Sequence, residues 1–426
     1  MENTEKLALF GGPKVITTEF QRYNSIGKEE VAAAKAVIET GVLSKYLGCW
    51  DPDFYGGEKV REFEQRWAEY FRVKHAITVN SNTSGLMAAV GAIGIEPGDE
   101  VIVSPWTMSA TATAILVWNA IPVFADIEAE TFNLDPASIE KNITPYTRAI
   151  MVTDIFGHAA RLDEIMAIAR KHKLKVIEDA AQAPGAIYKN KLVGTIADIG
   201  VFSLNYHKHI HTGEGGVCVT NNDILAERLQ LIRNHAEAVV GDKGVSNLSN
   251  MIGFNFRITE IEAAIGLEQL KKLKKFTEER IYAADQISHG LKNLKGLRGP
   301  IIKPDCTHVY YVYPLVLDEN QTGIPRPRLL EALRAEGMRI SCGYCNLHTL
   351  PMYKHKIAYG NKGFPWKSDV YRGQVQYGEG ICPVAEAMHL HKYMGIPMCL
   401  FKYTQEEVDL IIKAFQKVWA NLDKLK

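Results

Sequence analysis

The chain has 426 residues and carries 49 Lys and Arg against 49 Asp and Glu, so its formal net charge is zero. This length predicts two or three domains and excludes a single small binding module. Hydrophobic residues make up 46% and charged residues 23%, which is typical of a folded globular protein and excludes a disordered chain. Because the sequence has no excess of positive charge, we expect no nucleic-acid partner.

No membrane or secretory signal is evident. The longest apolar stretch, residues 114–125, is interrupted by Asn119 and Pro122, and it is shorter than the roughly 20 residues that cross a bilayer. The N-terminus lacks the regions of a signal peptide. Seven cysteines, an odd number in a long chain, do not suggest a disulfide framework. We therefore expect a cytoplasmic protein without a membrane partner.

The sequence of the N-terminal part predicts an arm followed by two helices. Residues 1–27 have few periodic apolar positions and are predicted to form an N-terminal arm. Residues 28–40 are rich in Glu, Ala and Lys and stop before Gly41, which predicts a helix. A second amphipathic helix is predicted from four apolar residues at helical spacing, Val60, Phe63, Trp67 and Phe71.

Short apolar runs then alternate with helical stretches. The runs cover residues 75–80, 101–104, 122–126, 149–154, 175–179, 199–204 and 215–220. Their continuous apolar character predicts a largely parallel, seven-stranded sheet buried between helices. One intervening helix should begin at Asp135–Pro136, an N-cap followed by proline. The sequence thus predicts an α/β large domain over residues 28–285.

The pattern changes in the last third of the chain. Residues 259–294 predict one long helix or a helix pair. After them come four segments that indicate a smaller α+β domain over residues 286–426, namely 308–317, 328–337, 338–344 and a final helix at 405–422. Residues 345–381, rich in Pro, Gly, Tyr and His, predict a long functional loop.

Three segments that follow predicted strands carry candidate chemistry: SNTSG at 81–85, IEDAAQAPGA at 177–186 and FSLNYHKHIHTGEGG at 202–216. Ligands of open α/β sheets bind beyond the carboxyl ends of the strands. A carboxylate, a lysine and a turn rich in backbone amides are what pyridoxal phosphate (PLP) requires. Alone, Asp179 would be interpreted as a helix N-cap and Lys208 as a surface lysine; together they predict a PLP site.

The sequence resembles the DegT-type aminotransferases that make amino sugars and aminocyclitols. The resemblance covers nearly the whole chain, through GGPK, GDEVIVSPWTMSATATAI, PVFADIEAETFNLDP, FGHAARLDEI, IEDAAQAPGA, TGEGG, GFNFRITEIEAAIGLEQL, NLHTLPMY and CPVAEA. It implies the type I PLP fold of aspartate aminotransferase. It also implies PLP as cofactor and transamination as the reaction.

The resemblance assigns roles to eight residues. It implies that Lys208 holds the cofactor as a Schiff base, that Asp179 pairs with the pyridine nitrogen and that Gln182 approaches the phenolic oxygen. Trp106 falls where the family stacks an aromatic ring on the cofactor. The remaining residues, Thr83, Ser84, Ser203 and Asn255, are implied to bind the phosphate, with Asn255 serving the neighbouring subunit. The active unit is thus expected to be a homodimer with shared active sites.

The sequence departs from the family pattern at two positions. Asn82 stands where the family commonly has glycine before Thr83, and Ala197 stands where glycine is common. Histidines flank Lys208, and some family members use histidine in its place. Because five residues separate Phe202 from Lys208, the spacing assigns the Schiff-base position to the lysine. No carboxylate or cysteine at ligand spacing accompanies the histidines, so we expect no metal.

The resemblance predicts a PLP-dependent aminotransferase that moves an amino group from an amino acid to a small-molecule keto sugar, sugar acid or cyclitol. Glutamate is the expected donor, with glutamine next. An octulosonate of lipopolysaccharide biosynthesis is one candidate acceptor, suggested by the length of the chain. The alternatives are a nucleotide-linked keto sugar as acceptor, and a PLP-binding regulatory protein without turnover.

Overall fold

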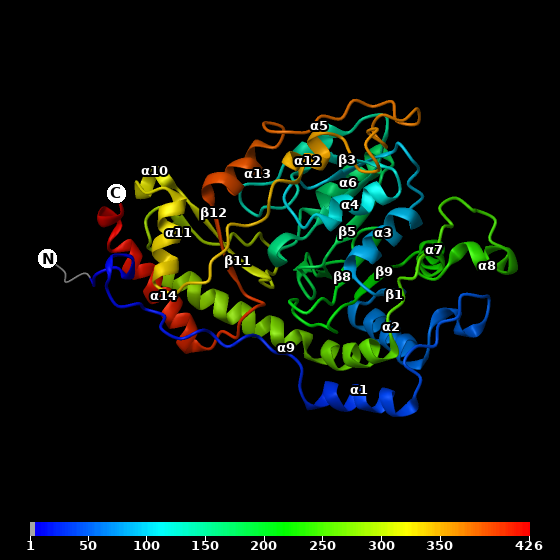
Figure 1. Ribbon diagram of the computed structural model, residues 1–426, viewed down its shortest axis with the longest axis horizontal. Helices are drawn as coiled ribbons and strands as arrows, with labels where there is room; N and C mark the ends of the chain where they lie inside the picture. Colours follow the sequence, from blue (N-terminus) through cyan, green and yellow to red (C-terminus); the bar gives the residue numbers. More distant parts are fainter. Residues whose placement is uncertain (1–4) are drawn as a thin grey trace.

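The computed structural model describes residues 5–426, and a seven-stranded sheet forms its centre (Figure 1). In chain order its strands are β1 (His75–Val79), β2 (Glu100–Val103), β3 (Ile121–Phe124), β4 (Thr147–Thr153), β5 (Lys175–Asp179), β8 (Ile199–Ser203) and β9 (Gly216–Thr220). Their spatial order is β1-β9-β8-β5-β4-β2-β3, and only β9 runs antiparallel to its neighbours. All seven predicted strands therefore join one mostly parallel sheet, as expected.

Helices bury both faces of this sheet, which explains the continuous apolar runs. One face packs against α3 (Asn82–Ala92), α4 (Ala110–Val117) and α7 (Asp223–Arg233). The other packs against α2 (Glu58–Phe71), α6 (Leu162–His172) and α9 (Glu260–Leu291). The predicted α2 face is confirmed, because Val60, Phe63, Trp67 and Phe71 are all buried.

Three further helices complete this part, α1 (Lys28–Thr40), α5 (Pro136–Asn142) and α8 (Ala236–Lys243). The side chain of Asp135 accepts hydrogen bonds from the backbone N–H groups of Ala137 and Ser138, which confirms the predicted cap of α5. The prediction at 259–294 left open one helix or two; the structure has one, α9. Its first turn is capped reciprocally by Thr259 and Glu262.

A smaller α+β unit follows α9. Its sheet has three antiparallel strands, β10 (Leu297–Arg298), β11 (Val312–Leu317) and β12 (Tyr393–Pro397). Its helices are α10 (Glu319–Thr322), α11 (Arg326–Ala335), α12 (Pro351–Lys354), α13 (Pro383–Ala387) and α14 (Gln405–Trp419). The division into residues 1–27, 28–285 and 286–426 remains a prediction. Its boundary at 285 falls inside α9, which contacts α1 and α2 as well as α14.

One of the four segments that indicated this unit forms no regular element. Residues 338–344 form no strand, and only Ser341 makes an isolated bridge, to Gly395. The third strand is instead β12, whose glycine and proline disfavour a strand locally. Pairing with β11 over five residue pairs overrides that local preference.

The N-terminal arm packs on the smaller unit. Glu336, which is fully buried, accepts hydrogen bonds from the backbone N–H groups of Ala8 (2.8 Å) and Val15 (3.1 Å). Its charge is paired with Lys417 at 3.0 Å. The buried carboxylate therefore fastens the arm to α11 and α14.

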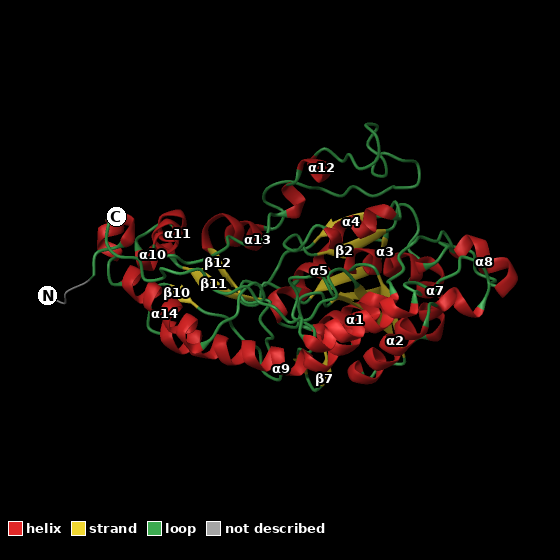
Figure 2. Cartoon of the chain, turned by 60° about the horizontal axis from the view of Figure 1, so that its bottom comes forward, coloured by secondary structure: helices red, strands yellow, loops and turns green. Residues whose placement is uncertain are grey.

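The predicted loop at 345–381 contains α12 and otherwise little regular structure, and it passes over the edge of the large sheet near α4 (Figure 2). Three tyrosine hydroxyls attach it there. Tyr359 donates to the carbonyl of Leu116, and Tyr377 donates to that of Pro122. Tyr371 donates to the carboxylate of Glu100 at 2.8 Å. These bonds hold the loop on β2, β3 and α4.

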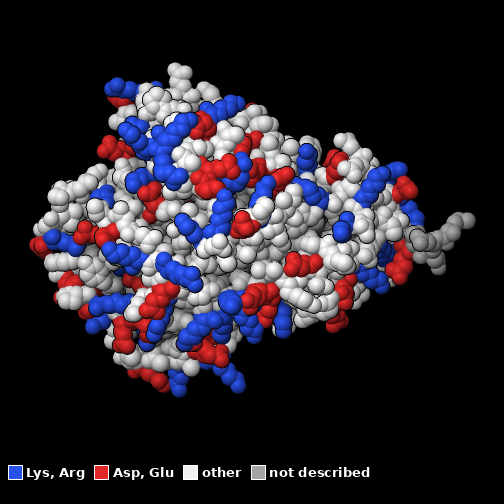
Figure 3. All heavy atoms as spheres, turned by 180° about the vertical axis from the view of Figure 1, so that it is seen from behind, with Lys and Arg blue, Asp and Glu red and all other residues white. Residues whose placement is uncertain are grey.

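Charges of both signs are interspersed on the surface. On the face seen in Figure 3, Lys and Arg side chains alternate with Asp and Glu, in keeping with equal numbers of the two kinds. Within residues 5–426 no helix is both long and apolar enough to span a bilayer.

Candidate active site

The sheet brings the predicted residues to one edge. Because β1, β5 and β8 run in the same direction, the turn after β1, Asp179 at the end of β5 and Ser203 at the end of β8 lie at the same edge of the sheet. Lys208 follows in the loop after β8 and is close enough to Asp179 for their charges to interact. The exposed fractions are only 8% for Lys208 and 4% for Asp179.

Asp179 is held by donors on several sides. Its Oδ2 accepts a hydrogen bond from the hydroxyl of Thr111 at 2.9 Å, and its Oδ1 accepts one from the backbone N–H of Ala181 at 3.3 Å. Burial raises the pKa of Asp179, and Thr111, Ala181, Lys208 and Asn82 oppose that rise. No helix begins after Asp179, so the helix-cap interpretation does not apply.

Lys208 has the environment of a reactive amine. Its Nζ lies 4.3 Å from the ring centroid of Tyr311. Burial lowers the pKa of Lys208 to about 8, while Asp179 and Cys399 act in the opposite direction. Near pH 8 the amine of Lys208 is therefore neutral in a substantial fraction of the molecules. The neutral amine is the form that attacks a carbonyl.

The start of α3 forms a candidate phosphate site. Ser81 caps the helix through the backbone N–H of Ser84 at 3.0 Å, and the hydroxyl of Ser84 donates to Asn80 at 2.6 Å. Among residues 5–426 the backbone N–H groups of Asn82 and Thr83 have no acceptor. Free N–H groups at a helix N-terminus attract anions.

The other predicted residues differ in their surroundings. The hydroxyl of Ser203 accepts a hydrogen bond from the backbone N–H of Asn205 at 3.3 Å. Trp106 is fully buried and packs edge-on against Phe156 and Tyr393. Asn255 is exposed, and its side-chain oxygen accepts a hydrogen bond from Arg257 at 2.8 Å.

The two departures from the family pattern have distinct consequences. The side-chain Nδ2 of Asn82 is buried, and within residues 5–426 it has no hydrogen-bond partner of standard geometry, although it lies near Asp179. The backbone N–H of Ala197 donates to Glu178 at 3.2 Å, in a turn held by that buried carboxylate.

Sequence reasoning missed three residues that contact this site: Thr111, Tyr311 and Tyr344. Thr111 lies within TMSATATAI, in the first turn of α4. Because α4 is the helix that follows β2, its start could have been recognised as part of the site. Tyr311 and Tyr344 precede and follow α11, so nothing in their local sequence places them beside Lys208 and Gln182.

The histidines near Lys208 serve structural contacts. His209 is fully buried and bonds through Nε2 to the carbonyl of Val309 at 2.9 Å, while Nδ1 of His211 accepts the backbone N–H of Gly213. In the part of the chain that the structure describes, no group of three or more His, Cys, Asp or Glu could hold a metal ion.

Three buried histidines predict that the protein is less stable in acid. Burial lowers the pKa of His158, and it lowers those of His209 and His308 well below 6.5. Because the unfolded chain binds more protons at these three histidines, their contribution to the free energy of unfolding should fall as the pH drops below about 6.5. Melting temperatures at pH 7.5 and 5.5 measure the effect, and His308→Asn should reduce it. The exposed His355→Asn is the control; an equal reduction there would contradict the prediction.

Comparison with known proteins identifies the chain. Residues 26–378 match the DegT/DnrJ/EryC1/StrS aminotransferase family. The chain belongs to this family. It is 37% identical over 316 residues to GDP-perosamine synthase of Caulobacter vibrioides, covering 72% of this chain and 83% of that protein. It is 30% identical to a putative L-glutamine:3-amino-2,3-dideoxy-scyllo-inosose aminotransferase of Streptoalloteichus tenebrarius, covering 99% of this chain and 100% of that protein.

The fold agrees with this membership in the DegT/DnrJ/EryC1/StrS family. The aminotransferase from Psychrobacter cryohalolentis superposes with a TM-score of 0.80 at 28% identity, covering 95% of this chain and 100% of that chain. The protein is accordingly a PLP-dependent sugar or aminocyclitol aminotransferase of type I fold. The donor set fits the cofactor, because a buried lysine, a buried carboxylate and free helix N–H groups lie at one edge of the sheet.

Proposed function

We propose that the protein transfers an amino group from an amino acid to the keto or aldehyde carbon of a cyclitol or sugar, with Lys208 and Asp179 as its catalytic residues. The observation that carries the proposal is a buried lysine amine close enough to a buried carboxylate for their charges to interact. Asp179 ends β5, and Lys208 lies in the loop after β8.

Each residue has a defined task in this proposal. PLP, when bound, supplies a ring that accepts electrons from the carbon that loses or gains the amino group. Asp179 holds a proton on the ring nitrogen, and Thr111 keeps the carboxylate in place at 2.9 Å. Lys208 binds the cofactor and, when freed by the donor, moves a proton through Nζ. The start of α3, with Thr83 and Ser84, and Ser203 bind the phosphate.

For the acceptor we propose a keto cyclitol. The aminocyclitol relative from Streptoalloteichus tenebrarius aligns over 99% of this chain, including the loop at 345–381. That relative is named for glutamine, so glutamine joins glutamate as a proposed donor. GDP-perosamine synthase of Caulobacter vibrioides aligns over 72% of this chain and supports the second candidate, a nucleotide-linked keto sugar. An octulosonate acceptor rests only on the length of the chain and its extra segment at 345–381.

Two optical half-reactions test the proposal. The PLP-loaded protein is first mixed with glutamine or glutamate, and conversion of the cofactor to its amino form is followed by absorbance. The amino form is then mixed with a panel of keto cyclitols, nucleotide-linked keto sugars and keto sugar acids. We expect conversion with a donor and reversal with a keto cyclitol. Cofactor binding without conversion by any amino acid would favour the regulatory alternative.

We also propose a homodimer in which Asn255 serves the partner's site. Asn255 is exposed, and the segment before it exposes Leu248 and Ile252 at 60% and 64%. An exposed apolar segment leading to a polar residue suits a subunit interface.

Subunit mixing tests this arrangement. Asn255→Ala should weaken cofactor retention, and Lys208→Ala should be inactive. A mixed dimer would contain one site with both defects and one with neither, so random 1:1 exchange should restore about a quarter of the wild-type activity. Mass spectrometry of differently tagged subunits verifies the exchange. No recovery in exchanged dimers would contradict the shared site.

A further inference from the structure

We infer that Tyr344 is a positioning residue of the active site, which fixes the side-chain amide of Gln182 so that a single N–H faces the cofactor's phenolic oxygen. The side-chain Nε2 of Gln182 donates to the hydroxyl of Tyr344 at 3.0 Å. The inference rests on the proposed function, since it takes Gln182 as the residue that approaches that oxygen.

The hydrogen bonds determine how the amide of Gln182 is oriented. The backbone N–H of Phe156 can only donate, and it lies 2.8 Å from Oε1 of Gln182. Oε1 must therefore be the oxygen, and the opposite atom must be the NH2 group. One N–H of that group bonds to Tyr344, and within residues 5–426 the other has no partner. The amide thus offers one free donor in a fixed direction.

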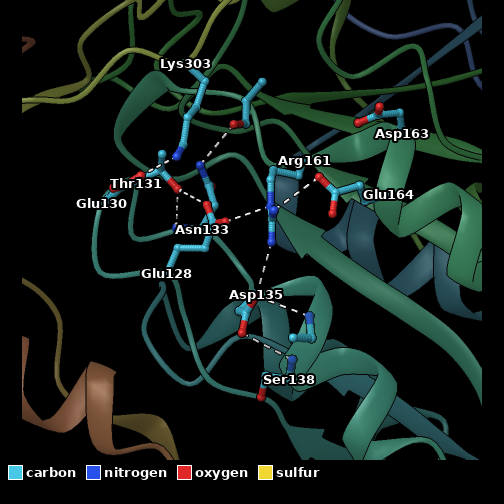
Figure 4. A network of polar contacts seen from close by, with 12 residues as sticks. Glu128, Glu130, Thr131, Asn133, Asp135, Ser138, Arg161, Asp163, Glu164 and Lys303 are labelled. Carbon is cyan, nitrogen blue, oxygen red and sulfur yellow. Dashed lines mark hydrogen bonds and ion pairs between the residues drawn. The ribbon is translucent and has the colours of Figure 1, made fainter.

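The turn that supplies the Phe156 N–H is itself tightly held. Phe156 has φ of +60°, a left-handed conformation that is unfavourable for a side-chain-bearing residue. The backbone N–H of Ile155 donates to Asn133 at 3.0 Å. The amide of Asn133 in turn donates to the carbonyls of His158 and Ala159, beside the ion pairs of Arg161 (Figure 4). Strain maintained in this way is typical of functional sites.

Tyr344 is fixed from three directions. Its carbonyl accepts the indole N–H of Trp106, its ring lies nearly parallel to that of Phe156 at 13°, and its hydroxyl interacts with Tyr311. Burial raises the pKa of Tyr344 to about 12, so the hydroxyl stays protonated at working pH. Tyr344 is thereby a neutral acceptor for Gln182.

The smaller unit thus contributes directly to the site. Tyr344 orients Gln182, and the neighbouring Tyr311 lies under the Nζ of Lys208 at 4.3 Å. The backbone N–H of Tyr311 donates to the carbonyl of Phe156 at 2.8 Å. Phe156 therefore links Tyr311, which lies beside Lys208, to Tyr344, which holds the amide of Gln182.

Removal of the Tyr344 hydroxyl should be visible in the cofactor itself. Without that anchor the amide of Gln182 can rotate, and its donor stabilises the ionised phenolic oxygen less. We expect Tyr344→Phe to raise the midpoint pH of the absorbance titration of bound PLP. The dissociation constant of PLP should rise about 2- to 10-fold, the effect of one lost hydrogen bond. Neither measurement needs a donor or an acceptor.

A double-mutant cycle tests the inference. Gln182→Ala should shift the titration in the same direction, and Tyr344→Phe should add little in that background, because both act through one amide. Tyr353→Phe is the matched control, since within residues 5–426 the buried hydroxyl of Tyr353 has no partner. If Tyr344→Phe does not fold, Tyr344→Leu removes the same hydroxyl.

The outcomes separate the inference from the proposed function. An unchanged titration in Tyr344→Phe, or shifts that add fully with Gln182→Ala, would overturn the role of Tyr344 and leave the proposed function standing. A wild-type protein that binds no PLP would overturn both. A shift confined to Tyr344 and Gln182, absent from Tyr353→Phe, is the expected result.

Discussion

Lys208→Ala should lower turnover at least about 10³-fold, because the side chain both binds the cofactor covalently and moves the proton. The fold should persist, since Lys208 makes no salt bridge among residues 5–426 and alanine fills less space. Purified variant and wild type are compared in the donor half-reaction by absorbance. Circular dichroism verifies the fold.

Covalent labelling provides an independent check. Borohydride reduction of the PLP-loaded wild type, followed by peptide mapping, should place the cofactor on Lys208. The matched control is Lys354→Ala, whose amine is paired with Glu379 on the loop at 345–381. Wild-type turnover in Lys208→Ala, or label on another lysine, would show that the nucleophile has been misassigned.

Asp179→Asn should slow the chemical step about 10²- to 10³-fold, which corresponds to about 3–4 kcal/mol of barrier. Asparagine keeps the hydrogen bond from Thr111 but cannot hold a proton on the ring nitrogen. In the native protein, burial raises the pKa of Asp179. The raised pKa makes the carboxylate a stronger partner for that proton.

Rapid mixing separates this effect from a loss of binding. With Asp179→Asn the amino donor should still bind with an affinity near that of the wild type, while optical conversion of the cofactor slows. Asp163→Asn, at an exposed carboxylate paired with Lys189, is the control. A variant with a lower melting temperature and an undiminished half-reaction rate would mean that Asp179 is structural.

The architecture of the large sheet could be predicted from the amino-acid sequence. Its seven strands are buried on both faces, so each appears as a continuous apolar run that needs no knowledge of its neighbours. The helices before and after the sheet were equally predictable, because α1 stops at Gly41 and α9 carries a complete capping box at Thr259. Asp179 and Ser203 end two of these strands and the turn at 81–85 follows a third, so their meeting at one edge follows from strand direction, whereas the role of Gln182 was implied only by resemblance.

The contribution of the smaller unit depends on packing between segments that lie far apart in the sequence. Tyr393–Pro397 became a strand because β11 offers it hydrogen-bond partners, whereas residues 338–344 have only an isolated bridge. Tyr311 and Tyr344 reach Lys208 and Gln182 from distant parts of the chain, through contacts that no local pattern records. Periodicity reports burial within one element, while contacts between elements depend on how the units pack.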